Sequence, residues 1–212
     1  MKTNQHPTDA LLAQYAAGDI GEAVSLAIAA HLTYCPECRA KVAEYEAMFG
    51  GVMAAEPMAA EAPSAGLMAM LDGESATPIT APQRTVAQGP LPRAIAEKVG
   101  VDFDAIPWKF RLPGVMEYEF IDNDGEKASL LKVRPGASVP QHTHEADELT
   151  VVFDGLLEDG DARYGIGDFS VADQTVDHHP QAGGDRTCIC LAVLTGGLTF
   201  TGRFGRALNL FS

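Results

Sequence analysis

The sequence has little positive charge, few cysteines and no long apolar run. Lys and Arg total 15 against 29 Asp and Glu, which gives a formal net charge of -14. A surface that binds duplex nucleic acid clusters Lys and Arg to neutralise phosphates, and neither half of this chain is basic. A membrane-spanning helix requires about 18 or more consecutive apolar residues, and none are present. We therefore expect neither direct nucleic-acid binding nor a membrane anchor.

The N-terminus and the cysteines indicate a reducing compartment. Residues Met1–Pro7 lack the apolar segment of a secretory signal peptide, so we expect a cytoplasmic location. Thiols stay reduced there, and the four cysteines are predicted to be metal ligands or free thiols. Cys188 and Cys190 alternate on one predicted strand, where we expect buried thiols because neighbours on one strand face rarely reach disulfide geometry.

A proline-rich stretch divides the chain into two predicted domains of different type. Pro78, Pro82, Pro90 and Pro92 lie among Ser, Thr, Gln and Gly, a composition typical of linkers. Helical spacing dominates before this stretch, and short strands with Gly-rich turns dominate after it. The predicted fold class is α+β with two domains, a helical bundle followed by an antiparallel β-barrel of jelly-roll type. The expected boundaries are 1–78 for the bundle, 79–95 for the linker and 96–212 for the barrel.

The expected helices have recognisable start and stop signals. Thr8 or Asp9 can cap the first helix, which Gly18 ends, and Asp19 can cap the second. The third helix begins at Pro36, as suits the first turn of a helix. Its expected end is Gly50–Gly51. A fourth, very apolar segment is Leu67–Leu71, either packed on the bundle or exposed as an anchor for a partner groove.

Five segments beyond residue 110 are predicted strands. Their apolar residues alternate or run continuously, and Asp122–Gly125 is a turn signal between the first two. The expected strands are Met116–Phe120, Ser129–Val133, Leu149–Phe153, Arg186–Leu194 and Leu198–Phe204.

A first cluster of metal-ligand residues lies in the helical half. His31, Cys35 and Cys38 follow the spacing His-x3-Cys-x2-Cys, and two helices that meet near residue 34 would bring them to one point. Zinc prefers four tetrahedral nitrogen and sulfur ligands. His6 is the other histidine of this half and is the candidate fourth ligand. Since a small bundle has little core, zinc is expected to hold it together.

A second cluster lies in the strand half. His142 and His144 alternate and share one strand face, Glu148 follows, and His178 completes a set of three histidines and one glutamate. His179 is an alternative last ligand. Such a set suits zinc or another divalent transition metal. Glu145 and Asp147 are expected either to orient the histidines or, in the simpler interpretation, to be solvated.

These motifs carry a family resemblance. The His31–Cys38 motif in an N-terminal helical domain resembles the zinc-binding anti-sigma domain, and that family's upstream histidine matches His6 by position. The frame from Gly136 to Gly155, with His142, His144 and Glu148, resembles the first cupin motif. The second cupin motif is degenerate here, because His178 is retained without the usual Pro and Gly.

In this order the two domains resemble ChrR-type anti-sigma factors. The resemblance implies a non-enzymatic regulator that binds an extracytoplasmic-function sigma factor one to one, keeps it from RNA polymerase, and releases it under oxidative stress of the singlet-oxygen type that the cupin domain senses. The alternative is a metal-dependent cupin oxygenase, similar to acetylacetone-cleaving dioxygenases, with a helical oligomerisation domain.

Overall fold

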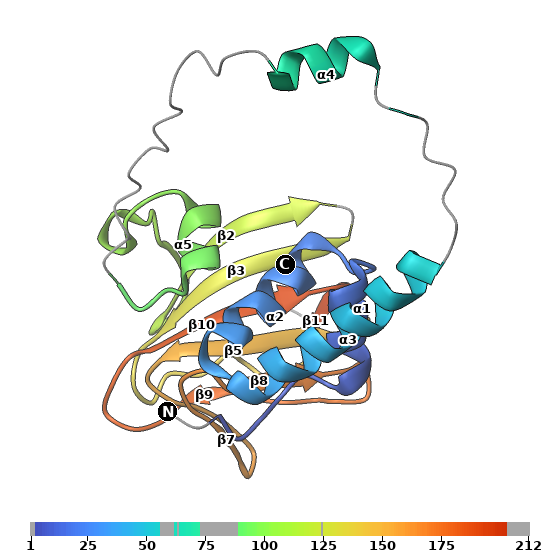
Figure 1. Cartoon of the computed structure of the whole chain (residues 1–212). Coiled ribbons are helices and arrows are strands. Elements are labelled where there is room, and N and C mark those ends of the chain that lie inside the picture. Colours follow the sequence, from blue (N-terminus) through green and yellow to red (C-terminus); the bar gives the residue numbers. More distant parts are fainter. Residues whose placement is uncertain (1–2, 56–61, 63, 73–88, 124, 203–212) are drawn as a thin grey trace.

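The protein consists of helices laid on one face of a β-sandwich. The computed structural model describes residues 3–55, 62, 64–72, 89–123 and 125–202. Figure 1 shows α1, α2 and α3 crossing the same face of the largest sheet, with α5 beside them. The helices are α1 (Asp9–Ala17), α2 (Glu22–Tyr34), α3 (Pro36–Ala55), α4 (Ala65–Asp72) and α5 (Arg93–Val99), and a 3₁₀ turn spans Phe103–Ala105.

Local signals set both ends of α1 and the start of α3. Thr8 caps α1 by accepting a hydrogen bond from the backbone N–H of Leu11, and Gly18 ends it in the left-handed conformation at φ 72°. Helix α3 begins at Pro36 as predicted. Its predicted end at Gly50–Gly51 was wrong, since the helix continues through both glycines to Ala55; their cost of about 1 kcal/mol each did not stop it.

The predicted cap of α2 was also wrong. Its N-cap is Gly21, not Asp19, and Gly21 has no side chain to cap with. A carboxylate from the strand half takes that role, because Glu126 accepts a hydrogen bond from the backbone N–H of Ala23 at 3.0 Å. A Cβ on Gly21 would lie 2.0 Å from Glu126 Oε1, so only glycine leaves room for this contact.

The strands form three antiparallel sheets. The largest has six strands in the order β1-β2-β3-β10-β5-β8, and sheets β11-β4 and β7-β6-β9 form the opposing layer. The fold prediction of helices followed by a jelly roll is confirmed, although hydrogen bonding makes a sandwich and not a closed barrel. The strands are β1 (Lys109–Leu112), β2 (Val115–Asn123), β3 (Glu126–Val133), β4 (His142–His144), β5 (Glu148–Asp154), β6 (Leu157–Asp159), β7 (Ala162–Tyr164), β8 (Phe169–Ala172), β9 (Gln181–Ala182), β10 (Cys188–Leu194) and β11 (Leu198–Phe200).

All five predicted strands are present, with shifted ends. The predicted hairpin is confirmed, since Asn123 pairs with Glu126 across a two-residue turn in which Gly125 has φ 81°. Residues 203 and 204, the predicted end of the last strand, lie outside the described residues.

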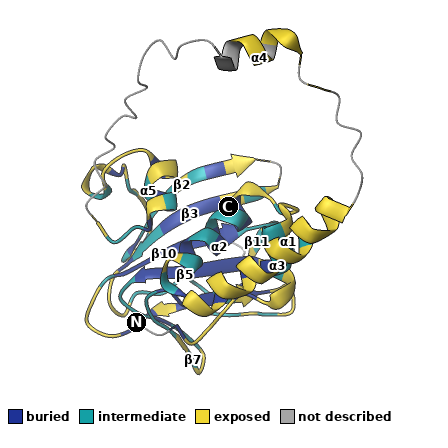
Figure 2. Ribbon diagram, viewed as in Figure 1, coloured by how far each residue is buried: buried dark blue, intermediate teal, exposed yellow. Residues whose placement is uncertain are grey.

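Strands β5 and β10 separate two apolar layers. Leu149 and Val151 on β5 face the helices, and so does Leu191 on β10, whereas Val152 and Cys190 point into the sandwich. Figure 2 shows these central strands buried and the outer side of α3 exposed. Alternation of side chains along a strand explains the division. Helices and sheet therefore share one continuous core.

The segment between the two halves is only partly described. Residues 73–88 lie outside the described residues, and with them both residue 78, the expected end of the helical domain, and the first part of the expected linker at 79–95. Arg93–Val99 forms α5, whose Ile95 is fully buried against the shared core. Figure 1 draws α4 away from the other helices, and its Met68 is 45% exposed. Within the described residues, every helix is too short or too polar to cross a membrane.

Candidate metal centres

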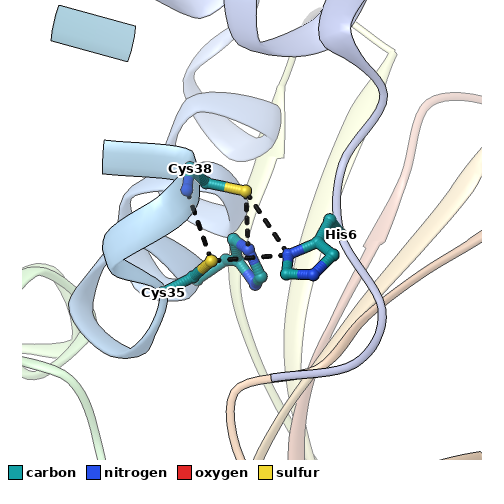
Figure 3. A group of neighbouring side chains, drawn as sticks. His6, Cys35 and Cys38 are labelled. Carbon is teal, nitrogen blue, oxygen red and sulfur yellow. Dashed lines mark hydrogen bonds between the residues drawn. The ribbon is translucent and has the colours of Figure 1, made fainter. Parts of the chain in front are cut away.

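The N-terminal cluster is assembled from three segments. His31 lies in the last turn of α2, Cys35 is at the bend between α2 and α3, and Cys38 is in the first turn of α3. Figure 3 shows the imidazole of His6, from the segment before α1, pointing at the two thiols. The helix start at Pro36 thus turns both cysteines toward the histidines, and the structure brings together all four predicted residues.

The spacing of the four ligand atoms fits a tetrahedral ion. His6 Nδ1 lies 3.4 Å from Cys35 Sγ and 3.5 Å from Cys38 Sγ, and His31 Nε2 lies 3.3 Å from Cys38 Sγ. Zinc bonds of 2.0–2.3 Å place tetrahedral ligand atoms about 3.3–3.8 Å apart. All four ligand atoms lie within 4.8 Å of one another. The residues therefore fit a four-coordinate metal.

The pKa shifts of the two thiols also fit a site that binds a cation. Burial raises the pKa of the Cys38 thiol to about 12, and the adjacent Cys35 adds to the rise. Burial acts the same way on Cys35, but hydrogen bonds from Thr3 and from the Cys38 backbone bring its pKa below the ordinary value. Burial also lowers the pKa of His31 and keeps its imidazole neutral, as a metal ligand must be. Cys35 is therefore the more easily ionised of the two thiols, and a bound cation would stabilise both thiolates.

The second cluster lies inside the sandwich. His142 and His144 are the two ends of β4, and Glu148 is the first residue of β5. His178 is brought in by two backbone hydrogen bonds of 3.0 Å with His142, from an isolated bridge rather than a full strand. Of the two predicted alternatives, His178 lies in the group with His142, His144 and Glu148, and His179 is exposed.

One carboxylate oxygen lies at the centre of the three imidazoles. Glu148 Oε2 is 2.7 Å from His144 Nε2 and 3.4 Å from Nε2 of both His142 and His178. Although burial would raise the pKa of Glu148, these imidazoles hold it well below the ordinary value. Both ring nitrogens of His144 are buried, and neither makes a well-directed hydrogen bond in the described part of the chain, although Nε2 lies only 2.7 Å from the Glu148 carboxylate. An orphaned imidazole nitrogen aimed at a carboxylate is the arrangement that a metal would satisfy.

Two outer contacts orient these histidines. Asp159 Oδ2 accepts from His178 Nδ1 at 2.6 Å, and the carbonyl of Pro140 accepts from His142 Nδ1 at 2.8 Å, so each Nε2 faces inward. Burial lowers the pKa of His178, but Glu148 and Asp159 outweigh burial and raise it. Glu145 and Asp147 are exposed, which confirms the simpler prediction that they are solvated.

A cavity opens beside the cupin cluster. Its volume is about 340 Å³, and apolar side chains make up most of its wall. His142, Glu148 and His178 line this cavity, and so do both partners of the Arg111–Glu117 ion pair. Cys190 lines the cavity, and the predicted pair Cys188 and Cys190 is buried and free of disulfides. The thiol of Cys188 and burial keep the pKa of Cys190 well above its usual value.

Comparisons with known proteins agree with this geometry. The family model described as the ChrR cupin-like domain matches residues 96–196, so the sandwich is a cupin domain. The anti-sigma-E factor ChrR of Cereibacter sphaeroides is 38% identical over 203 residues, which cover 94% of this chain and 93% of the relative. A crystal structure of Rhodobacter sphaeroides SigE in complex with the anti-sigma ChrR matches with a TM-score of 0.76 and 36% identity, over 91% of this chain and 99% of that chain.

The fold and site identify a class of protein, and the comparisons then identify the family. A cupin domain that follows a helical domain with a His/Cys group suited to metal binding defines a class of two-domain regulators. The likeness to ChrR extends over nearly the whole chain. The chain belongs to the family of ChrR-type anti-sigma factors.

Proposed function

We propose that this protein is a cytoplasmic anti-sigma factor that sequesters an extracytoplasmic-function sigma factor in a one-to-one complex. The observation that carries the proposal is family membership over nearly the whole chain, helical domain and cupin domain alike. Sequestration would keep the sigma factor from RNA polymerase. The net charge of -14 suits a partner with basic polymerase- and promoter-facing surfaces rather than nucleic acid itself.

The contact surface is proposed to include the far end of α3. Met48, Val52 and Met53 are 55%, 62% and 69% exposed. Met48 and Val52, four residues apart, share one side of the last turns of α3, and Met53 follows Val52 directly. Exposed Met side chains adapt readily to partner grooves. Met68 on α4, which Figure 1 draws apart from α3, is proposed as a second exposed contact. Met53→Lys should therefore weaken sigma capture, and Lys98→Met, on the opposite side of the bundle beside Glu22, is the matched control.

The N-terminal group is proposed to hold zinc through His6, His31, Cys35 and Cys38. The two sulfur and two nitrogen donors are a set that zinc prefers for structural sites. The ion would cross-link the segment before α1 to α2 and α3, whose packing forms the partner surface. The cupin group is proposed to hold zinc or another divalent transition metal through His142, His144, Glu148 and His178.

The cupin domain is proposed to be the sensor of oxidative stress of the singlet-oxygen type, and the protein is not an enzyme in this proposal. A signal that acts there must change the relative free energies of the sigma-bound and released states. Because Ala27 and Ile28 of α2 pack on the sheet, removal of residues 91–212 would expose a buried face. Point variants in the full-length chain are therefore the sharper test.

The test compares His142→Ala/His144→Ala with wild type in cells that carry a reporter for the sigma factor. We expect repression in the dark to persist with at most a modest loss, and induction by singlet oxygen to be lost. A variant that is still induced like wild type would refute the sensor role. A variant that no longer represses at all would refute the division of labour between the two domains.

The cavity of about 340 Å³ beside the cupin ligands favours one alternative, a metal-dependent oxygenase whose helical domain serves oligomerisation. Cavities of this size hold small molecules. Oxygen consumption by the iron-loaded protein with small β-diketones would support the oxygenase. A Met53→Lys variant that derepresses the sigma factor while the cupin metal stays bound would support the anti-sigma factor instead.

A further inference from the structure

The N-terminal group of four candidate metal ligands is in direct contact with the cupin domain, although the cupin domain supplies none of the four. The contact is made by the turn at residues 165–168, between β7 and β8. His31 Nδ1 donates a hydrogen bond of 2.7 Å to the carbonyl of Gly167. With Nδ1 so engaged, Nε2 is the nitrogen that faces Cys38 Sγ at 3.3 Å. The turn thus sets both the tautomer and the ring plane of one ligand.

The same turn holds the segment that carries the second histidine. Asp168 Oδ1 accepts hydrogen bonds from the backbone N–H groups of Asn4, at 2.6 Å, and Gln5, at 3.2 Å. The backbone N–H of Phe169 donates to the Gln5 carbonyl at 3.1 Å. Three hydrogen bonds therefore fix the two residues that precede His6, which is itself exposed and has little packing of its own.

Asp168 and Gly167 suit these roles for physical reasons. Asp168 is only 4% exposed, and its second oxygen accepts from the backbone N–H of Gly165 at 2.8 Å, so the carboxylate is fully engaged. Gly167 has φ +86°, and a Cβ there would lie 2.6 Å from Cβ of Tyr34. Any side chain at 167 would push the turn away from the end of α2.

The same turn is also connected to the cupin group of candidate metal ligands. The backbone N–H of Gly167 donates to the carbonyl of Val152 on β5 at 2.8 Å. Four residues after Asp168, Ala172 at the end of β8 pairs with Glu148 at the start of β5. One short strand therefore joins the turn behind His6 and His31 to the carboxylate at the centre of the three cupin histidines.

We propose that Gly167 and Asp168 are positioning residues of the N-terminal metal site, and that β8 carries the state of the cupin site to them. The proposal deepens the proposed function, on which its regulatory meaning rests. If the proposed function holds, a change at Glu148 that shifts β8 weakens the hydrogen bonds that position His6 and His31. The helical surface that binds the partner is then held less firmly. The positioning claim itself concerns metal affinity alone and can be tested without any partner.

The test uses Co²⁺ in place of zinc, in the full-length protein. Thiolate ligands give Co²⁺ a near-ultraviolet charge-transfer band, and the cupin group contains no cysteine, so this band reports the N-terminal site. Competition with a chelator then gives the Co²⁺ affinity of that site. The variants are Asp168→Ala, which removes all three accepted hydrogen bonds, and Asp168→Asn, which keeps an acceptor oxygen. The matched control is Asp161→Asn, at an exposed position on the preceding turn.

We expect Asp168→Ala to lower the Co²⁺ affinity of the N-terminal site by about tenfold, as losses of outer contacts to metal-bound histidines do. Asp168→Asn should recover part of the loss, and Asp161→Asn should match wild type. The visible bands of Co²⁺ in the cupin site should stay unchanged, which shows that the domain is folded. Wild-type affinity in both Asp168 variants would overturn the positioning role.

The link between the sites has its own readout. His142→Ala/His144→Ala disables the cupin site, and we expect a measurable fall in Co²⁺ affinity at the distant N-terminal site. The same change in an Asp168→Ala background should produce a smaller fall, because the side-chain part of the connection is already removed. Equal effects in the two backgrounds, or no effect in either, would refute transmission through the turn. Since neither measurement involves the sigma factor, failure here leaves the anti-sigma proposal standing.

Discussion

The contact between Glu126 and the start of α2 yields a quantitative prediction. Glu126 lies at the start of β3, and its carboxylate takes the place of a missing N-cap side chain, at 3.0 Å from the backbone N–H of Ala23. Removal of an N-cap acceptor costs roughly 0.5–2 kcal/mol. We expect Glu126→Ala to cost about 1 kcal/mol, which in a chain of this size lowers the melting temperature by about 2–4 °C.

Gly21→Ala should disrupt the same contact from the other side. A Cβ at position 21 would lie 2.0 Å from Glu126 Oε1, so the carboxylate must move away and the cap is lost. The double variant Gly21→Ala/Glu126→Ala relieves that clash. Its cost should therefore be no larger than that of Glu126→Ala alone, a strong departure from additivity.

The assay is thermal unfolding of the metal-loaded protein followed by circular dichroism. Glu44→Ala, at an exposed position on α3, is the matched control and should stay within about 0.5 kcal/mol of wild type. If the costs of Gly21→Ala and Glu126→Ala simply add in the double variant, the carboxylate is not the cap of α2 and the reasoning fails.

Two further predictions concern the cupin site. In the metal-free protein the pKa of Glu148 is lowered from 4.5 and that of His178 is raised from 6.5. The stabilisation from this ion pair is therefore fully present at pH values above the pKa of an unfolded glutamate and below the pKa of an unfolded histidine. It is lost as the pH rises through the folded-state pKa of His178. The melting-temperature advantage of metal-free wild type over His178→Ala should be larger at about pH 6 than at about pH 9, and an advantage that grows toward pH 9 would contradict the assignment. Asp159→Asn, which weakens the hydrogen bond to His178 Nδ1, should lower metal affinity at the cupin site by roughly 10–100-fold; equilibrium dialysis measures this, with Asp161→Asn as control, and equal affinities would argue against an orienting role.

Site residues that lie close together in the sequence could be predicted without the structure. His31, Cys35 and Cys38 lie around one predicted helix junction, and His142 and His144 lie on one face of one strand, so short sequence spacing brings each set together. His6 was inferred from a shortage of other histidines, and the structure places it in the same group. Hairpin β2–β3 followed from its turn residues.

Residues that act across long sequence separations gave no such signal. Glu126 caps a helix 103 positions away, and Gly167 accepts from a histidine 136 positions away. Asp159 carries no motif of its own, and only its strand places it behind His178. The close packing of helices on the sheet was also missed, because the apolar face of α2 predicts burial but not its partner.

The central claim is that a metal bound by the N-terminal thiols and imidazoles shapes the surface that captures the sigma factor. Its most direct test is the affinity of full-length protein for an extracytoplasmic-function sigma factor from the same genome, by titration calorimetry, with Cys35→Ala/Cys38→Ala beside Cys188→Ala/Cys190→Ala. We predict a loss of at least about 100-fold, or close to 3 kcal/mol, for the first pair, and wild-type affinity for the second. Undiminished capture by the Cys35→Ala/Cys38→Ala protein would contradict the account.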